Sequence, residues 1–253
     1  MQLSEMTWPA VDALDRKTPV LIPIAALEQH GRHMPVFTDS LLCGEVTRRI
    51  DAALSDHILM TPLMWLGNSE HHLDFPGTMS ASPRVYLDLL KDMVENFLFH
   101  GFKRIVLLNG HGGNMIPSQQ ALFEIRQERR KENDLLLITT TYWTLGDPPQ
   151  DPQESIFQRQ MGHACEWETS MIMRIRPELV VGDPGDVADV PWGTAFLPGN
   201  RAWTMADRSE PGHVGYPQYA SAEKGEFLLQ AMSQNAINYL QRVIDWDGVT
   251  WDA

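Results

Sequence analysis

The sequence predicts an α/β fold in which helices cover both faces of a mostly parallel sheet. Four apolar runs of strand length alternate with longer segments of helical periodicity. Strands that alternate with helices of this length are typical of βαβ crossovers, which require parallel strand pairing. Of the 253 residues, 43% are hydrophobic and 21% are charged, as in ordinary globular proteins, and no linker or repeat divides them. We therefore expect one domain over residues 1–253.

The first half of the chain is expected to form strand, helix, strand and helix in that order. Residues 19–27 are an apolar run typical of a buried strand, and 40–54 repeat apolar side chains at helical spacing. A second apolar run at 57–66 is also expected to be a strand. The next helix, 82–101, starts with a Ser-Pro pair that supplies an N-cap and a first helical residue, and Gly101 ends it.

The second half continues this alternation of strands and helices, and its composition then changes. Strands are predicted at 103–108 and 135–143, and helices at 118–133, 163–177 and 219–246. Pro177 stops the fourth of the five predicted helices. Between 177 and 218 proline and glycine recur without a strong period, which indicates loops with short strands. The final helix is expected to pack back on the sheet.

The charge of the chain argues against nucleic acid and membrane partners. The formal net charge is −13, and the acidic residues are spread along the chain with no basic block. We therefore expect a small-molecule or peptide substrate. The N-terminus lacks the pattern of a signal peptide, and no run approaches the roughly 18 apolar residues of a membrane span. Cys43 and Cys165 lack CxxC spacing, so both are interpreted as core residues of a cytoplasmic protein.

Acidic and imidazole side chains gather where the predicted strands end. The first strand leads into Glu28, His30 and Asp39, the second into "GNSEHHLDFPGT", and the third into "NGHGGN" with His111. Six of the nine histidines fall in these loops or in "GHACEWE". Because the carboxyl ends of parallel strands meet at one edge of a sheet, these side chains are expected to face one site.

Several carboxylates and neutral imidazoles at one site favour a divalent cation, since burying them without positive charge is costly. Nitrogen and oxygen ligands without thiolate suit Zn²⁺, Mn²⁺ or Fe²⁺. Glu28 and His30 are two residues apart on an extended segment, so both side chains point the same way. Simpler interpretations also exist. Asp39 could be a helix N-cap, His30 a hydrogen-bonded or surface histidine, and "NGHGGN" a glycine-rich turn capped by Asn114.

The predicted helix at 163–177 adds an acid on an otherwise apolar stripe. Glu168 shares its helical face with three apolar side chains, so its carboxylate needs a partner. That partner could be a salt bridge from a neighbouring helix, a metal ion or a metal-bound water. His163 can reach the same site only from the N-terminal edge of the helix, and Glu166 points elsewhere. Whether Glu166 rather than Glu168 contacts the site stays open.

Five stretches resemble the signature stretches of the creatininase (creatinine amidohydrolase) family, in the same order. They are "IPIAALEQHGRHMPVFTD", "HHLDFPGTMS", "LLNGHGGN", "GHACEWETS" and "GYPQYASAEKGE", and they span about residues 19–226. The resemblance implies a three-layer α/β/α sandwich with a binuclear metal centre. It also implies hydrolysis of carbon–nitrogen bonds in small cyclic amides, formamides or modified peptides, and a homo-oligomer that is often a hexamer.

The resemblance also implies roles for individual residues. The metal ligands would be Glu28, His30, Asp39 and His111, with Asp39 as the bridge. The catalytic histidine would be His163. Substrate contacts are expected at Ser69, His72 and Gly112.

The chain departs from creatininase itself at three places. An acid that completes the second metal site there is Gly113 here, and Glu168 is the available replacement. A substrate-stacking tyrosine is replaced by Gly112, and a Trp-Asp pair before the catalytic histidine is replaced by "RQMG". These departures argue against creatinine as the substrate.

The sequence therefore predicts a metal-dependent amidohydrolase with two divalent ions per chain. A bridging water acidified by both ions would supply the hydroxide that attacks the carbonyl, and His163 would carry the proton to the leaving nitrogen. The substrate pocket would include Trp143, Trp192 and Trp203, unless these residues serve core packing. Alternatives are a family member acting on an oxidised cyclitol, a catalytically silent metal-binding scaffold, and a metallophosphatase, for which cationic groups are too few.

Overall fold

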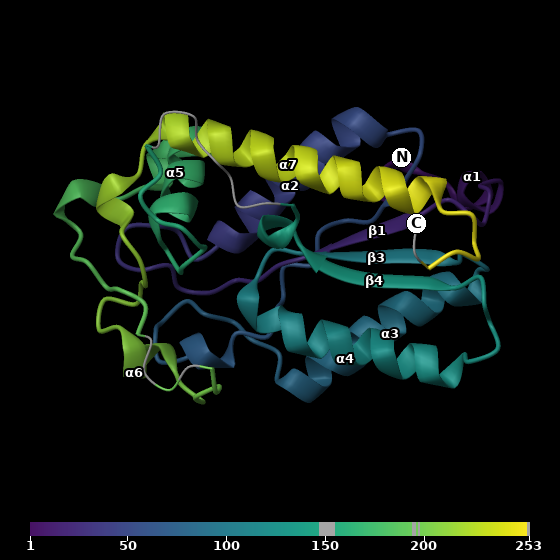
Figure 1. Cartoon of the computed structure of the whole chain (residues 1–253), viewed down its shortest axis with the longest axis horizontal. Helices are drawn as coiled ribbons and strands as arrows, with labels where there is room; N and C mark the ends of the chain where they lie inside the picture. Colours follow the sequence, from purple (N-terminus) through teal and green to yellow (C-terminus); the bar gives the residue numbers. More distant parts are fainter. Residues whose placement is uncertain (147–154, 194–195, 197, 252–253) are drawn as a thin grey trace.

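A four-stranded parallel sheet runs through the centre of the computed structural model, which describes residues 1–146, 155–193, 196 and 198–251 (Figure 1). The strands are β1 (Val20–Ile24), β2 (Leu59–Met60), β3 (Arg104–Asn109) and β4 (Leu136–Thr141). Their order is β2-β1-β3-β4, and every neighbouring pair is parallel. The predicted parallel α/β class is confirmed.

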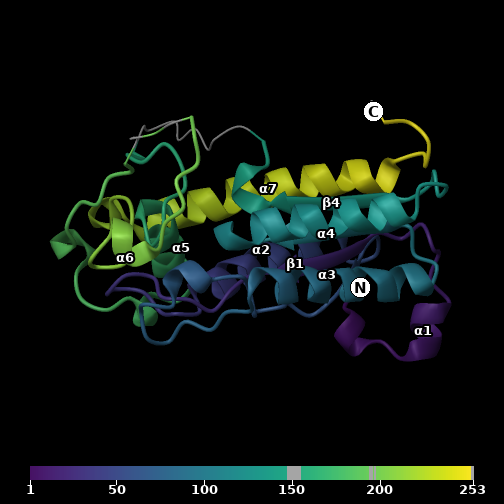
Figure 2. The ribbon, with the colours of Figure 1, turned by 90° about the horizontal axis from the view of Figure 1, so that it is seen from below.

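Helices lie on both faces of the sheet and complete three layers (Figure 1, Figure 2). One face is covered by α3 (Pro83–Phe99) and α4 (Met115–Glu128), and the other by α2 (Thr38–Leu54), α5 (Glu166–Ile175) and α7 (Ala222–Asp245). The short helices α1 (Trp8–Asp12) and α6 (Met205–Arg208) lie at opposite ends of the molecule. The three-layer α/β/α sandwich is therefore confirmed.

The core consists of one hydrophobic cluster on each side of the sheet. Val20, Ile22 and Ile24 of β1 belong to the cluster beneath α3 and α4. Leu21, between them in sequence, belongs to the cluster beneath α2, α5 and α7. Because alternate side chains of a strand point to opposite faces, a strand covered on both faces is apolar throughout. This explains why the central strands read as continuous apolar runs.

The second predicted strand is much shorter than expected. Of residues 57–66, only Leu59–Met60 form β2. Pro62 has no backbone N–H and cannot continue the ladder, so the chain leaves the sheet there. It returns once at Met64, whose carbonyl accepts a hydrogen bond from Ala25 N–H at 2.9 Å. The apolar character of residues 57–66 did not reveal that the strand ends at Met60.

The segment from 177 to 218 contains no strand among its described residues, contrary to the prediction of short strands; residues 194, 195 and 197 lie outside that description. Instead it contains α6 and 3₁₀ turns at Pro177–Leu179, Pro184–Asp186 and Pro217–Tyr219. Each turn starts with proline, whose fixed φ suits the first position of a helical turn. Helix α7 then begins after Ser221, whose hydroxyl accepts the Lys224 N–H.

Two predicted helices shift by a few residues at both ends. Helix α4 begins at Met115 and ends at Glu128, earlier at both ends than the predicted 118–133. Helix α5 begins at Glu166 and ends at Ile175, inside the predicted 163–177. In the part of the chain that the structure describes, no helix has the length and apolar character needed to cross a membrane.

Candidate metal centre

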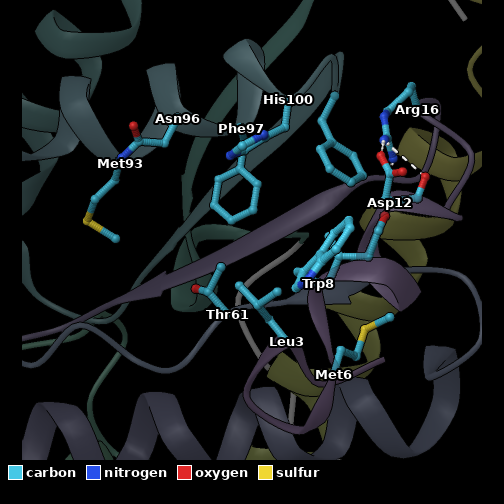
Figure 3. A pocket seen from close by; sticks show the side chains of 12 residues that line it. Leu3, Met6, Trp8, Asp12, Arg16, Thr61, Met93, Asn96, Phe97 and His100 are labelled. Carbon is cyan, nitrogen blue, oxygen red and sulfur yellow. Dashed lines mark hydrogen bonds and ion pairs between the residues drawn. The ribbon is translucent and has the colours of Figure 1, made fainter.

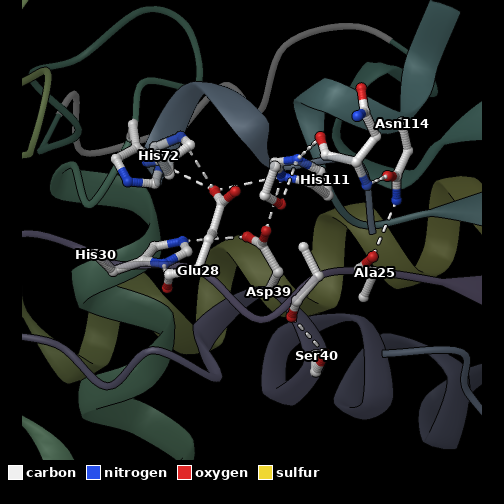
Figure 4. Close-up of polar contacts among 12 residues, drawn as sticks. Ala25, Glu28, His30, Asp39, Ser40, His72, His111 and Asn114 are labelled. Carbon is white, nitrogen blue, oxygen red and sulfur yellow. Dashed lines mark hydrogen bonds and ion pairs between the residues drawn. The ribbon is translucent and has the colours of Figure 1, made fainter. Parts of the chain in front are cut away.

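Acidic and imidazole side chains from four segments meet beyond the carboxyl ends of β1 and β3 (Figure 4). Glu28 and His30 come from the loop after β1, Asp39 from the first turn of α2, His111 from the loop after β3, and Glu168 from the first turn of α5. All five side chains are buried. The first turn of a helix suits a carboxylate because its free N–H groups carry partial positive charge. Two helices therefore present acids to this cluster.

Asp39 lies between two imidazoles. Its Oδ1 is 3.1 Å from His30 Nε2, and its Oδ2 is 2.9 Å from His111 Nδ1, although the second pair is not aligned as a hydrogen bond. The alternative of a helix cap is not supported, because Phe37 occupies the N-cap position and no side chain caps this helix end. Asp39 thus turns each carboxylate oxygen toward a different imidazole, as a bridging ligand would.

Glu28 is surrounded by three imidazoles. Its Oε1 lies 3.3 Å from His111 Nδ1, 3.4 Å from His72 Nε2 and 3.6 Å from His163 Nδ1 (Figure 4). Its Oε2 is buried and has no hydrogen-bond partner, and the same is true of Asp39 Oδ2. Buried carboxylate oxygens without a donor are rare in folded proteins and call for an explanation such as an ion.

Backbone carbonyls orient two of these imidazoles. His30 Nδ1 donates to the Glu28 carbonyl at 3.0 Å, which leaves Nε2 facing Asp39. His111 Nε2 lies 3.0 Å from the Asn68 carbonyl and 3.2 Å from Ser69 Oγ, which leaves Nδ1 facing the carboxylates. Such contacts fix the tautomer and ring orientation of a metal-ligating histidine. Ser69 is thus placed behind His111, and its contact with substrate stays a prediction.

Gln29 connects the other two histidines and was not identified from the sequence. Its Oε1 accepts the Gly31 N–H at 2.8 Å, and its Nε2 donates to the Gly212 carbonyl at 2.7 Å, which fixes the orientation of the amide. The remaining N–H then donates to His72 Nδ1 at 2.8 Å, so neutral His72 carries its proton on Nε2, toward Glu28. His163 Nε2 donates to the backbone carbonyl of Gln29 at 2.8 Å, which leaves His163 Nδ1 without a proton.

Glu168 is held at the cluster by the start of α5. Its Oε1 lies 3.7 Å from His30 Nε2, and its Oε2 accepts the Ala164 N–H at 2.5 Å. Ala164 adopts a φ of 50°, which is uncommon for a residue with a side chain. Ala164 lies between His163 and the helix, and His163 Nδ1 lies 3.6 Å from Glu28 Oε1.

Glu166 has a structural role instead. It accepts hydrogen bonds from the backbone N–H groups of Phe157 and Gln158 at 3.1 and 2.6 Å and from Lys224 Nζ at 2.7 Å. These contacts tie the segment before α5 to α7. Of the two acids that the sequence leaves open, Glu168 is therefore the one that faces the imidazoles.

The Lys224→Met variant is expected to lower the free energy of unfolding by about 3 kcal/mol without changing metal content. Removing the lysine leaves Glu166 buried without its counter-ion, and breaking a buried pair costs about 3–5 kcal/mol; the lower end applies because the Lys224 side chain keeps 15% exposure. Chemical denaturation measures the change. Lys91→Met, which breaks surface pairs with Glu124 and Glu128, is the matched control and should cost less than about 1 kcal/mol. An equal loss of unfolding free energy in Lys224→Met and Lys91→Met would contradict the structural role of Glu166.

The carboxylates raise the pKa of the imidazoles that face them. Burial alone would lower the pKa of His111, but the charges of Glu28 and Asp39 raise it to about 10. Burial would also lower the pKa of His30, yet Asp39 and Glu168 raise it well above its usual value. Burial would raise the pKa of Asp39, and the charged imidazoles hold it far below its usual range. Positive charge on the two imidazoles thus stabilises Asp39, and a bound cation would serve the same purpose.

The pKa of His163 shifts in the opposite direction to those of His30 and His111. Burial lowers its pKa well below the usual value, and the neighbouring His30 and His72 lower it further. Its ring lies 4.3 Å from the His30 ring and 4.4 Å from the His72 ring, centroid to centroid. His163 is therefore neutral in this cluster, and its Nδ1 faces Glu28.

The donor set fits divalent cations. Ligand atoms of Glu28, His30 and Asp39 all lie within 4.8 Å of one another, and so do those of His30, His163 and Glu168. Carboxylate and imidazole ligands without thiolate suit Zn²⁺, Mn²⁺ or Fe²⁺. A cation would neutralise the charge of the adjacent carboxylates. It could also be coordinated by Glu28 Oε2 and Asp39 Oδ2, the two carboxylate oxygens that lack hydrogen-bond partners.

The two glycines of "NGHGGN" differ in the space around them. A Cβ at Gly113 would lie 2.2 Å from the Asn68 carbonyl oxygen and 2.5 Å from His111 Nε2, so no side chain fits there. Gly113 therefore cannot be replaced by an acidic ligand without moving the loop. Gly112 borders open space, where substrate contact stays a prediction. Trp143 packs against the core beneath α7 rather than lining this site.

A separate cavity of about 660 Å³ lies at the other end of the molecule, beside α1 (Figure 3). Its walls are mostly apolar, and Trp8, Phe97 and Phe102 contribute the largest side chains. Its charged residues, Asp12 and Arg16, pair with each other at 2.8 Å. His100 is the single imidazole in its described lining. This cavity offers no cluster of ligands, so the chemistry is assigned to the carboxyl edge of the sheet.

Known proteins are similar to this chain over nearly all of its length. A family model described as creatininase, creatinine amidohydrolase, matches residues 4–240. Creatinine amidohydrolase of Pseudomonas putida is 29% identical over 92% of this chain and 93% of its own. A mycofactocin precursor peptide peptidase of Mycolicibacterium smegmatis is 29% identical over 88% of this chain and 84% of its own.

Solved creatininases share the fold. A creatininase mutant of Zn–Zn type superposes with a TM-score of 0.80 at 27% identity, covering 97% of this chain and 98% of that one. A manganese form gives a TM-score of 0.80 at 26% identity, covering 97% and 99%. The match of the family model over most of the sequence shows that this chain belongs to the creatininase family of metal-dependent amidohydrolases.

Proposed function

We propose that the chain hydrolyses an amide bond at a centre of two divalent ions. Glu28, Asp39 and His111 would hold one ion, and His30, Asp39 and Glu168 the other. The observation that carries this proposal is Asp39, because its two oxygens face different imidazoles at 3.1 and 2.9 Å. Zn²⁺, Mn²⁺ and Fe²⁺ all suit this donor set, and Zn–Zn and manganese forms of similar creatininases support the first two.

Bound ions would polarise the amide carbonyl and acidify a water that attacks it. His163 supplies the acid–base function, because its neutral Nδ1 faces the cluster while Nε2 is anchored to the Gln29 carbonyl. It can accept a proton at Nδ1 and return it to the leaving nitrogen. His72 Nε2–H points at Glu28 and would hold that carboxylate in position.

The substrate class proposed is a small cyclic amide, a formamide or a modified peptide. Relatives named for creatinine and for a precursor peptide support this range. A 3-dehydro-scyllo-inosose hydrolase of Thermotoga maritima, 25% identical over 89% of this chain and 76% of its own, keeps an oxidised cyclitol as the alternative. We also propose that residues 1–253 act as one cytoplasmic domain in a homo-oligomer, by resemblance to hexameric family members.

The Glu168→Gln variant is expected to lose one of two bound ions per chain. Glu168 is the acid whose Oε1 lies 3.7 Å from His30 Nε2, and no side chain fits at Gly113 to replace it. Elemental analysis after dialysis should give about one ion per chain. Glu166→Gln is the matched control on the same helix turn; it should keep both ions and lower thermal stability instead. Two retained ions in Glu168→Gln would show that Glu168 is not a ligand.

Release of amine or formate from a panel of small amides tests the proposed function. The metal-loaded protein should hydrolyse at least one amide, and chelation of the metal should stop the reaction. An intact metal site without turnover of any amide would favour the scaffold. Turnover of a cyclitol ketone alone would favour the alternative hydrolase.

A further inference from the structure

A second cavity, of about 710 Å³, lies beside the metal centre and contains an arginine without an ion pair to any described residue. Its walls include Trp192, Trp203, Met161 and Val214, and Arg208 of α6 lies among them. The Arg208 guanidinium lies over both indoles, with Cζ 4.2 Å from the Trp192 ring centroid and 4.5 Å from that of Trp203. Such stacking holds a guanidinium in one plane and leaves its N–H edge available.

Arg208 has no ion pair or hydrogen bond among the described residues. The acids next to it in sequence are already engaged. Asp207 caps its own helix by accepting the Thr204 N–H at 2.8 Å, and Glu210 pairs with Arg32 at 2.6 Å. Burial lowers the pKa of Arg208, as expected for a cation without a counter-ion. In a chain of net charge −13, a partly buried arginine that forms no ion pair with any described acid needs an explanation.

Two residues that line the cavity, Trp203 and Val214, contact residues of the metal centre or their neighbours. The Trp203 ring meets the edge of His71 at 5.1 Å, and His71 stacks on His111 at 5.7 Å. On the other side, the backbone of Val214 exchanges hydrogen bonds of 2.9 and 2.7 Å with that of His163. Helix α6 lies next to the 70–72 turn that carries His71 (Figure 1). A substrate whose amide lies at the metal centre can therefore extend into this cavity.

We propose that Arg208 binds a carboxylate of the substrate, and that the substrate is an N-acyl amino acid or a short peptide with a free C-terminal carboxylate. A guanidinium matches a carboxylate with two parallel N–H···O bonds, which strengthen where water is excluded. The two indoles lie against the guanidinium and shield part of it from water. Arg201 is the single other cation in the described lining, which is few for a phosphate dianion. This assignment rests on the proposed amide hydrolysis and narrows its substrate class.

Arg208 could instead serve only to hold the segment around Trp192 against α6. Tryptophan fluorescence measures the binding of paired probes to metal-loaded and to chelator-treated protein. This measurement separates the two roles. The probes are N-acetylglycine, N-acetyldiglycine and N-acetyltriglycine, each beside its C-terminal carboxamide. Each pair differs only in the negative charge, and the three lengths allow for the distance from the metal centre to Arg208.

The wild-type protein is expected to bind at least one acid about 10- to 100-fold more tightly than its carboxamide, as expected for hydrogen bonds to a charged group. Arg208→Gln should abolish that preference while leaving carboxamide binding unchanged, and Arg208→Lys should restore part of it. Arg32→Gln, which removes the same charge from an arginine already paired with Glu210, should keep the preference. The preference should survive metal removal.

Three results would overturn the assignment. They are equal binding of acid and carboxamide by the wild type, an equal loss of both in Arg208→Gln, and a preference that disappears with the metal. Hydrolysis is scored separately with the same probes. Turnover of carboxamides as fast as acids would refute the carboxylate pocket and leave the proposed function intact. Binding of acids through Arg208 without turnover of any amide would refute the proposed function and leave the pocket intact.

Discussion

The Asp39→Asn variant is expected to lose amide hydrolysis by at least about 10³-fold and to lose most of its bound metal. Asparagine keeps the size of the side chain and removes the charge that faces both His30 and His111. Losing a bridging carboxylate should weaken both ion positions, and a metal ion contributes several kcal/mol to stabilising the transition state. Elemental analysis and the rate of amine release measure the two effects.

Asp51→Asn is the matched control for this variant. Asp51 lies on the same helix, α2, and pairs with the N-terminal amine at 3.7 Å, far along the helix from the cluster. It should keep wild-type metal content and rate. Wild-type metal content in Asp39→Asn would contradict the bridging role, and equal loss in both variants would indicate damage to the helix.

The His163→Gln variant is expected to keep nearly full metal occupancy while kcat falls about 10²- to 10⁴-fold, the usual contribution of a positioned acid–base group. Glutamine can still donate to the Gln29 carbonyl but cannot accept and return a proton. Metal content and kcat of the same preparation provide the measurement. His33→Gln is the control, since His33 is buried nearby and contacts Thr169 Oγ1 at 3.0 Å. Loss of metal in His163→Gln would make His163 a ligand.

The sequence predicted the layers of the fold because apolar periodicity reports burial directly. It failed where one residue breaks a pattern of hydrogen bonds. Pro62 ends β2 after two residues, although the apolar run continues around it. The prolines between 177 and 218 indicate loops and short strands, whereas three of them, Pro177, Pro184 and Pro217, start 3₁₀ turns. A proline affects the backbone at one position, so hydropathy does not register it.

The convergence of Glu28, His30, Asp39 and His111 could be predicted because each follows a strand end or begins a helix. Parallel pairing then brings such positions together. Gln29 and Arg208 could not be identified in this way. Their roles depend on partners distant in sequence, such as Gly212 for Gln29 and Trp192 for Arg208. The lack of an acid near a guanidinium is visible only once the chain is folded.

Metal titration of chelator-treated protein tests the central claim most directly. Zn²⁺ or Mn²⁺ is added to the wild-type chain, and bound metal is counted by calorimetry and elemental analysis. The binuclear centre built around Asp39 predicts saturation at two ions per chain, with both lost in Asp39→Asn. Saturation at one ion, or binding that Asp39→Asn does not weaken, would contradict it.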